Sequence, residues 1–160
     1  QPKEVFAIMN YAVDDNERPI FYKKVVETVV HEFCHSFTKI KGDTEKALEK
    51  SGKALQEYTY FSMRRQAYST WRNILEESLV RAATICYLID HDYDEKDIRN
   101  AIIEQVDRNF FWMPELVQTL RYYESHRKKY PTFTSFYPEI IRFFDRYVTN
   151  MEKEMKKAMK

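Results

Sequence analysis

Residues 28–37 contain the pattern His-Glu-x-x-His, formed by His31, Glu32 and His35, inside a largely apolar run. Four residues make slightly more than one turn of an α-helix, so His31 and His35 lie about 40° apart on one helical face. Glu32 lies about 100° round from His31, beside the imidazoles rather than between them. The segment is therefore expected to form a helix that directs both histidines toward one point.

This arrangement suits metal chemistry. Two neutral imidazoles are good partial ligands for Zn²⁺, and a neighbouring carboxylate can take a proton from a water bound to the ion. The short pattern occurs by chance in unrelated helices, so its flanking positions matter, and here they are uncharged: Thr28, Val29, Phe33, Cys34, Ser36 and Phe37. With these flanks the segment resembles the extended pattern of the zincin metallopeptidases. That resemblance implies a peptide or protein substrate, His31 and His35 as metal ligands, and Glu32 as general base.

The composition favours helices. The chain has 160 residues, with only two glycines and five prolines to build hairpins, and its length suits one domain over residues 1–160. Lysine and arginine total 26 against 25 acidic residues, so no overall field attracts nucleic acid. No run of 18 apolar residues is present, which predicts no membrane span. The expected fold is mainly α.

The pattern of apolar residues predicts about six helices and one N-terminal β-strand. The strand is expected over 5–13 and the helices over 20–41, 45–60, 63–90, 94–109, 114–129 and 136–160, with the last ten residues fraying. Gly42 is expected to end the first helix. A lone strand cannot satisfy its own backbone, so we expect it to pair outside this chain, which would be the C-terminal part of a larger zincin-like domain whose upstream sheet is missing. Cys34 and Cys86 are expected to be buried thiols rather than a disulfide.

A catalytic zinc site usually has a third protein ligand. The metzincin pattern requires Gly at position 38 and His at position 41, and Thr38 and Lys41 exclude it. The gluzincins use a later glutamate, for which the candidates are Glu49, Glu57, Glu76 and Glu77.

Helical geometry favours Glu77 among these four. Glu76 is expected to form a solvated pair with Arg72, whereas Glu77 lies at the edge of the apolar sector of its helix and needs a partner. Glu57 remains an alternative on a more polar helix.

A more specific resemblance covers about residues 11–87. His31-Glu32-Phe33-Cys34-His35, followed by Met63, Tyr68, Trp71 and then Glu77-Ser78-Leu79-Val80-Arg81-Ala82, resembles an uncharacterised bacterial family, domain of unknown function 4932, which is gluzincin-like. The resemblance implies Glu77 as third ligand and Arg81 as a neighbour of the site. By analogy with zincins, the protein is expected to be exported.

Arg81 is also the preferred catalytic donor to a developing oxyanion, because it lies nearest the predicted ligands. The other candidates are Tyr87, His91, Tyr122, Tyr123 and His126. Two further interpretations remain open: a zincin-like binding or scaffold module without turnover, and a helical interaction module without metal.

Overall fold

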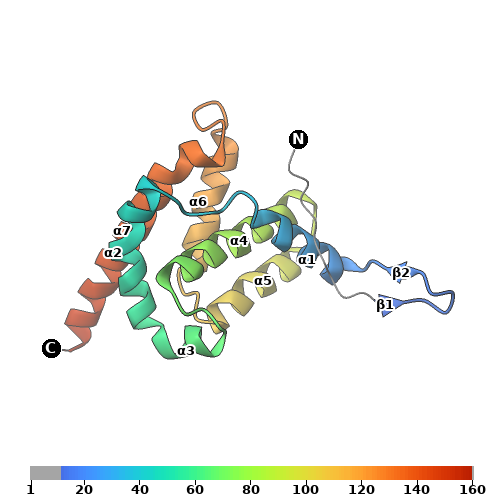
Figure 1. Ribbon diagram of the computed structural model, residues 1–160, viewed down its shortest axis with the longest axis horizontal. Coiled ribbons are helices and arrows are strands. Elements are labelled where there is room, and N and C mark those ends of the chain that lie inside the picture. Colours follow the sequence, from blue (N-terminus) through green and yellow to red (C-terminus); the bar gives the residue numbers. More distant parts are fainter. Residues whose placement is uncertain (1–11, 160) are drawn as a thin grey trace.

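The protein is described by a computed structural model that covers residues 12–159 (Figure 1). Within these residues the fold is mainly α, as predicted, with seven helices and two short strands. The elements in chain order are β1 (Ala12–Val13), β2 (Pro19–Ile20), α1 (Lys23–Cys34), α2 (Asp43–Tyr58), α3 (Tyr60–Arg65), α4 (Trp71–Asp90), α5 (Glu95–Asp107), α6 (Met113–Ser125) and α7 (Phe133–Ala158).

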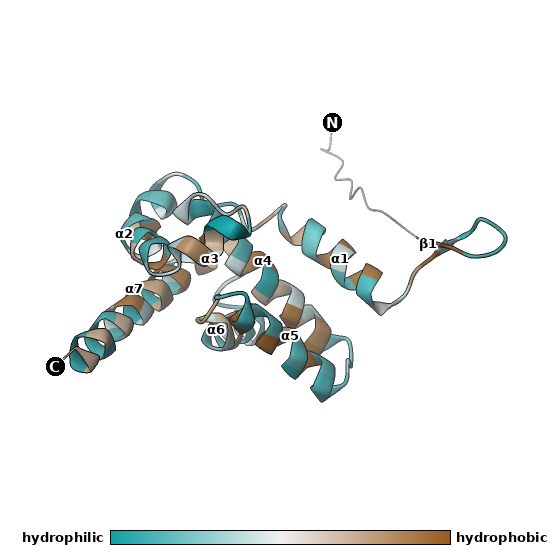
Figure 2. Cartoon of the chain, turned by 90° about the horizontal axis from the view of Figure 1, so that it is seen from below, coloured by the Kyte–Doolittle hydropathy of each residue, from teal (hydrophilic) through white to brown (hydrophobic). Residues whose placement is uncertain are grey.

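The two strands form a small antiparallel hairpin. Ala12 pairs with Ile20 and Val13 with Pro19, and the Asp14 carboxylate accepts two backbone N–H groups in the turn, each at 2.9 Å. The prediction that the strand must find its partner outside the chain is therefore wrong for β1, and residues 5–11 lie outside the described residues. The hairpin stands away from the helices in both Figure 1 and Figure 2, and Figure 2 shows that its tip is hydrophilic.

Helix α1 ends at Cys34, seven residues before the predicted end. The Cys34 carbonyl accepts the backbone N–H groups of Phe37 and Thr38, at 3.2 and 3.3 Å, and the Thr38 hydroxyl at 3.1 Å. The carbonyl is thus shared between donors three and four residues on, which tightens the last turn and satisfies a terminal carbonyl where the chain turns away. Gly42 does not end α1 as predicted; with φ of 61° it is the residue immediately before α2.

The predicted helix over 63–90 is divided in two. Met63 belongs to α3, and Ala67 has a φ of 66°, which interrupts the helical path. Helix α4 starts afresh at Trp71, where the Thr70 hydroxyl accepts the N–H of Asn73 at 3.2 Å. Residues 12–159 therefore contain one more helix than predicted.

The three C-terminal helices match their predictions in order, with shifted ends. Helix α7 begins three residues early because Thr132 and Ser135 form a reciprocal capping box. The structure continues α7 to Ala158, so the predicted fraying of its last ten residues is wrong in the described part.

Helix α4 occupies the centre of the fold and packs against α1, α2, α5 and α6 (Figure 1). Its predicted apolar sector is buried, including Ile74, Leu75, Leu79, Ala82 and Ile85. The same helix therefore supplies much of the core and presents its remaining face to α1. None of the helices in residues 12–159 has the length and apolar character that a membrane span needs.

Candidate metal centre

Helices α1 and α4 bring both histidines against Glu77. His31 lies on the last turn of α1, and His35 caps that helix with a helical φ of −57° and ψ of −22°. The Nε2 atom of His31 lies 3.4 Å from Glu77 Oε1, and Nε2 of His35 lies 3.8 Å from Glu77 Oε2. The two imidazole rings are 5.1 Å apart between centroids. Two nitrogens and one carboxylate thus converge from two separate segments.

Glu77 is a buried carboxylate, with 9% of its side chain exposed. A buried charge needs partners, and besides the imidazoles Glu77 has Arg81, whose Nη2 lies 2.8 Å from Oε1. Because Arg81 follows four residues later on α4, this ion pair forms within one helical turn.

The other glutamates considered as third ligand have different partners. Glu76 accepts the Ile40 backbone N–H at 2.9 Å and lies 3.4 Å from the Lys39 ammonium. The predicted pair of Glu76 with Arg72 is wrong, because Arg72 pairs with Glu45 on α2. Two candidates lie on the solvated α2 helix: Glu49, which pairs with Lys53 at 2.6 Å, and Glu57, which is exposed.

Glu32 lies on the exposed side of α1, next to the histidines. One potential ligand atom from each of His31, Glu32 and His35 lies within 4.8 Å of the others. Two carboxylates therefore flank the imidazoles, one buried and one exposed. The buried Glu77 is better suited to hold an ion, and the exposed Glu32 is better suited to exchange a proton with water.

Arg81 is held by a network that the sequence did not reveal. Its Nη2 donates to the Tyr68 hydroxyl at 3.0 Å, its Nη1 donates to Gln105 Oε1 at 2.6 Å, and its guanidinium lies 5.1 Å from the centre of the Phe110 ring. Its Nε is buried without a hydrogen-bond partner among the described residues. The sequence indicated Tyr68 only through the family resemblance. It gave no indication of Gln105, because the contact of Gln105 with Arg81 joins residues 24 positions apart.

The surroundings shift two pKa values at this site. Burial lowers the pKa of His31; the negative charge of Glu77 opposes this shift, and the positive charge of Arg81 adds to it. A lowered pKa favours the neutral imidazole, which is the form that binds metal. Burial also raises the pKa of Tyr68, as does the charge of Glu77, so its hydroxyl keeps its proton at neutral pH.

The other five candidate donors lie in two groups, and no contact of theirs with Glu77 is found among the described residues. Tyr87 and His91 stack with ring centroids 3.7 Å apart, and the Tyr122 and His126 rings lie 3.9 Å apart between centroids and are tilted by 31°. Tyr87, His91 and Tyr123 line the same large cavity.

Two cavities flank α1. A polar cavity of about 230 Å³ adjoins His31 and Arg81. A larger apolar cavity of about 520 Å³ is not lined by His31, His35 or Glu77. Its wall on α1 includes Val30 and Phe33, which point roughly 100° and 160° away from His31 around the helix. The larger cavity is therefore separate from the convergent histidines, and the polar one adjoins them.

Comparison with known proteins gives a family. The model described as Domain of unknown function (DUF4932) matches residues 3–143, so the chain belongs to that family, which confirms the resemblance noted in the sequence. No curated protein and no solved structure matches the chain. The family description assigns no activity, so a function must be argued from the site itself.

Proposed function

We propose that this protein is a zinc-dependent metallopeptidase of the gluzincin type. The observation that carries the proposal is the convergence of His31 and His35 on the buried Glu77 carboxylate, at 3.4 and 3.8 Å. Two imidazoles and a carboxylate are the ligand set of many catalytic zinc sites, and three protein ligands leave a position for water. The donor set therefore fits Zn²⁺ by its chemistry.

In this proposal the metal ligands and the general base are different residues of the chain. Zn²⁺, when bound by His31, His35 and Glu77, supplies a Lewis acid that lowers the pKa of water and polarises a peptide carbonyl. Glu32 accepts the proton of the attacking water and delivers it to the leaving amine. Its exposed position supports this role, since both water and substrate must reach it.

Arg81 enters the proposal as the cation nearest the ligand set. Its observed partners, Glu77 and Tyr68, support a role in fixing the Glu77 carboxylate, which complements its predicted role as donor to the oxyanion. A carboxylate held by a buried arginine keeps its charge and its orientation before any ion arrives.

The test separates metal binding from turnover. Zinc content is measured by elemental analysis after dialysis, and cleavage of a mixed peptide library is followed by mass spectrometry. We expect Glu32→Gln to retain zinc and to lose at least about 100-fold in cleavage rate. We expect Glu77→Gln to lose zinc affinity by more than the 10- to 100-fold that is typical of changes around metal ligands.

The matched control is Glu49→Gln, which removes an exposed carboxylate from α2. It should change neither zinc content nor cleavage. Undiminished cleavage by Glu32→Gln would remove the general-base role, and a wild-type protein without zinc would remove the proposal as a whole.

One observation favours a second candidate, a metal-binding or scaffold module without turnover. Arg81 already neutralises Glu77 at 2.8 Å, so the carboxylate has a partner without a metal ion. This candidate predicts a purified protein that cleaves no member of the peptide library, whether or not it contains zinc. The same two measurements therefore separate the candidates.

A further inference from the structure

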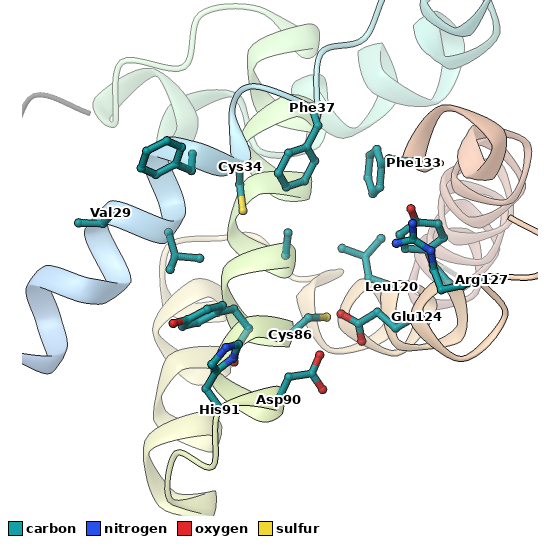
Figure 3. Close-up of a pocket in the computed structure, with 15 residues that line it drawn as sticks. Val29, Cys34, Phe37, Cys86, Asp90, His91, Leu120, Glu124, Arg127 and Phe133 are labelled. Carbon is teal, nitrogen blue, oxygen red and sulfur yellow. The ribbon is translucent and has the colours of Figure 1, made fainter. Parts of the chain in front are cut away.

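A cavity of about 520 Å³ lies between α1, α4, α6 and the start of α7 (Figure 3). Its size falls within the range of about 300–1,000 Å³ that is usual for sites that bind small molecules. Since His31, His35 and Glu77 do not line it, a ligand there would make no direct contact with the proposed metal ligands.

One end of this cavity is apolar and aromatic. Phe37 and Phe133 meet edge to face, with ring centroids 5.8 Å apart, and Figure 3 shows them together at one end. Phe37 and Phe33 are 48% and 43% exposed, so a ligand would cover apolar surface that now faces water. Cys34 and Cys86 are buried thiols whose pKa values are raised by burial, so they add no charge to the lining.

The other end carries two carboxylates, Asp90 and Glu124, which lie near each other in Figure 3. Both share a single nitrogen of Arg121, Nη1, which lies 2.6 Å from Glu124 Oε2. Asp90 Oδ2 and Glu124 Oε1 have no hydrogen-bond partner within residues 12–159. Burial raises the pKa of Glu124; the positive charge of Arg121 opposes this shift, and the negative charge of Asp90 adds to it.

Two other polar side chains of the lining, Arg127 and His91, have partners within the protein. Arg127 donates to the Pro131 carbonyl at 2.7 Å and lies over the Tyr123 ring at 4.5 Å, and no ion pair with Glu124 is found in the described part. His91 contacts the Tyr87 carbonyl at 2.9 Å through Nδ1 and stacks on the Tyr87 ring. Asp90 and Glu124 are therefore the acidic groups that this cavity presents to a ligand.

We propose that this cavity binds an organic ammonium with a bulky aromatic body. The body would lie between Phe33, Phe37 and Phe133, and the ammonium would donate to the free oxygens of Asp90 and Glu124. A cation placed there pairs with two carboxylates that now share one arginine nitrogen, which is the charge complementarity that selects an amine over other polar groups. The site is separate from the proposed peptidase centre and stands whether or not that centre holds zinc.

The test uses three probes with one common body: 4-phenylbutylamine, 4-phenylbutanol and 4-phenylbutanoate. Binding to the full chain is measured by isothermal titration calorimetry. We expect the amine to bind about tenfold more tightly than the alcohol, as one charged hydrogen bond implies, and the carboxylate to bind most weakly.

Two variants locate the binding. Glu124→Gln keeps the size of the side chain and should remove the preference for the amine while leaving the alcohol unchanged. Ala83→Phe adds bulk to the α4 wall of the cavity and should weaken both probes, and its thermal unfolding shows whether it remains folded. Equal affinity for amine and alcohol, an unchanged preference in Glu124→Gln, or no binding of any probe would overturn the proposal.

Discussion

The Nη2 atom of Arg81 lies 2.8 Å from Oε1 of Glu77, one turn apart on α4, and both side chains are almost fully buried. The pair joins the two imidazoles of the α1 end to the Tyr68 and Gln105 side chains. It therefore connects the candidate metal centre to the α3–α4 connection and to α5.

Arg81→Met should destabilise the metal-free protein by about 3 kcal/mol, because it leaves the Glu77 carboxylate buried without its cation. Saturating zinc should restore part of the loss, since an ion held by Glu77 replaces the missing positive charge. Urea unfolding with EDTA and with added zinc measures both effects. Arg81→Lys, which keeps the charge, is the control, and a Met variant as stable as wild type in EDTA would contradict the prediction.

Glu76→Gln should destabilise the protein by roughly 1–2 kcal/mol without changing its zinc content. The Glu76 carboxylate accepts the Ile40 N–H and lies near Lys39, so it fastens the segment after α1 to α4. Urea unfolding and elemental analysis on the same sample give the two quantities. A loss of zinc in this variant, as large as in Glu77→Gln, would show that the wrong glutamate has been assigned.

Gly52→Ala should be destabilising, against the usual gain from alanine in a helix. A Cβ at Gly52 would lie 2.5 Å from Cε3 of the Trp71 ring, so the ring or the helix that carries it would have to shift. Overpacking of this kind costs about 1–3 kcal/mol, which exceeds the gain of roughly 1 kcal/mol in helix propensity. The free energy of unfolding in urea measures the balance, and a stabilised variant would show that the contact gives way easily.

Glu139 should contribute a small, pH-dependent stability. The Tyr130 hydroxyl donates to it at 2.6 Å and, together with Arg142, lowers the pKa of Glu139 below its usual 4.5. A lowered pKa in the folded state means that the contribution is complete above about pH 4.5 and is lost as the pH falls through the folded-state value.

The comparison for Glu139 is the difference in unfolding free energy between wild type and Glu139→Gln from pH 2 to pH 6. The difference should be under about 1 kcal/mol, because the side chain is partly exposed, and should vanish at low pH. A difference that grows as the pH falls would have the wrong sign.

Helical periodicity predicted those features of the fold that depend on which face of a helix a residue occupies. The apolar sector of α4 and the position of Glu77 at its edge follow from the 100° step between residues, and the structure places that carboxylate beside both histidines. Cys34 and Cys86 are buried free thiols, as their helical surroundings predicted.

Contacts between distant segments explain what the sequence did not reveal. Glu76 appeared to face solvent because its partner, the Ile40 N–H, lies 36 residues away. Helix α1 ends inside an otherwise favourable helical pattern, and the bonds of Phe37 and Thr38 to the Cys34 carbonyl that close its last turn do not show in the periodicity. The hairpin was missed because β1 and β2 have only two residues each, too few for alternation to show.

The end of α1 contacts both the candidate metal centre and the large cavity. His31 and His35 face Glu77, and the residues just before them, Val30 and Cys34, form part of the cavity wall. A molecule that enters the cavity and shifts this turn must also shift both imidazoles. Thermodynamic linkage then requires reciprocity: the factor by which such a molecule alters the affinity for a metal ion equals the factor by which the ion alters the affinity for that molecule.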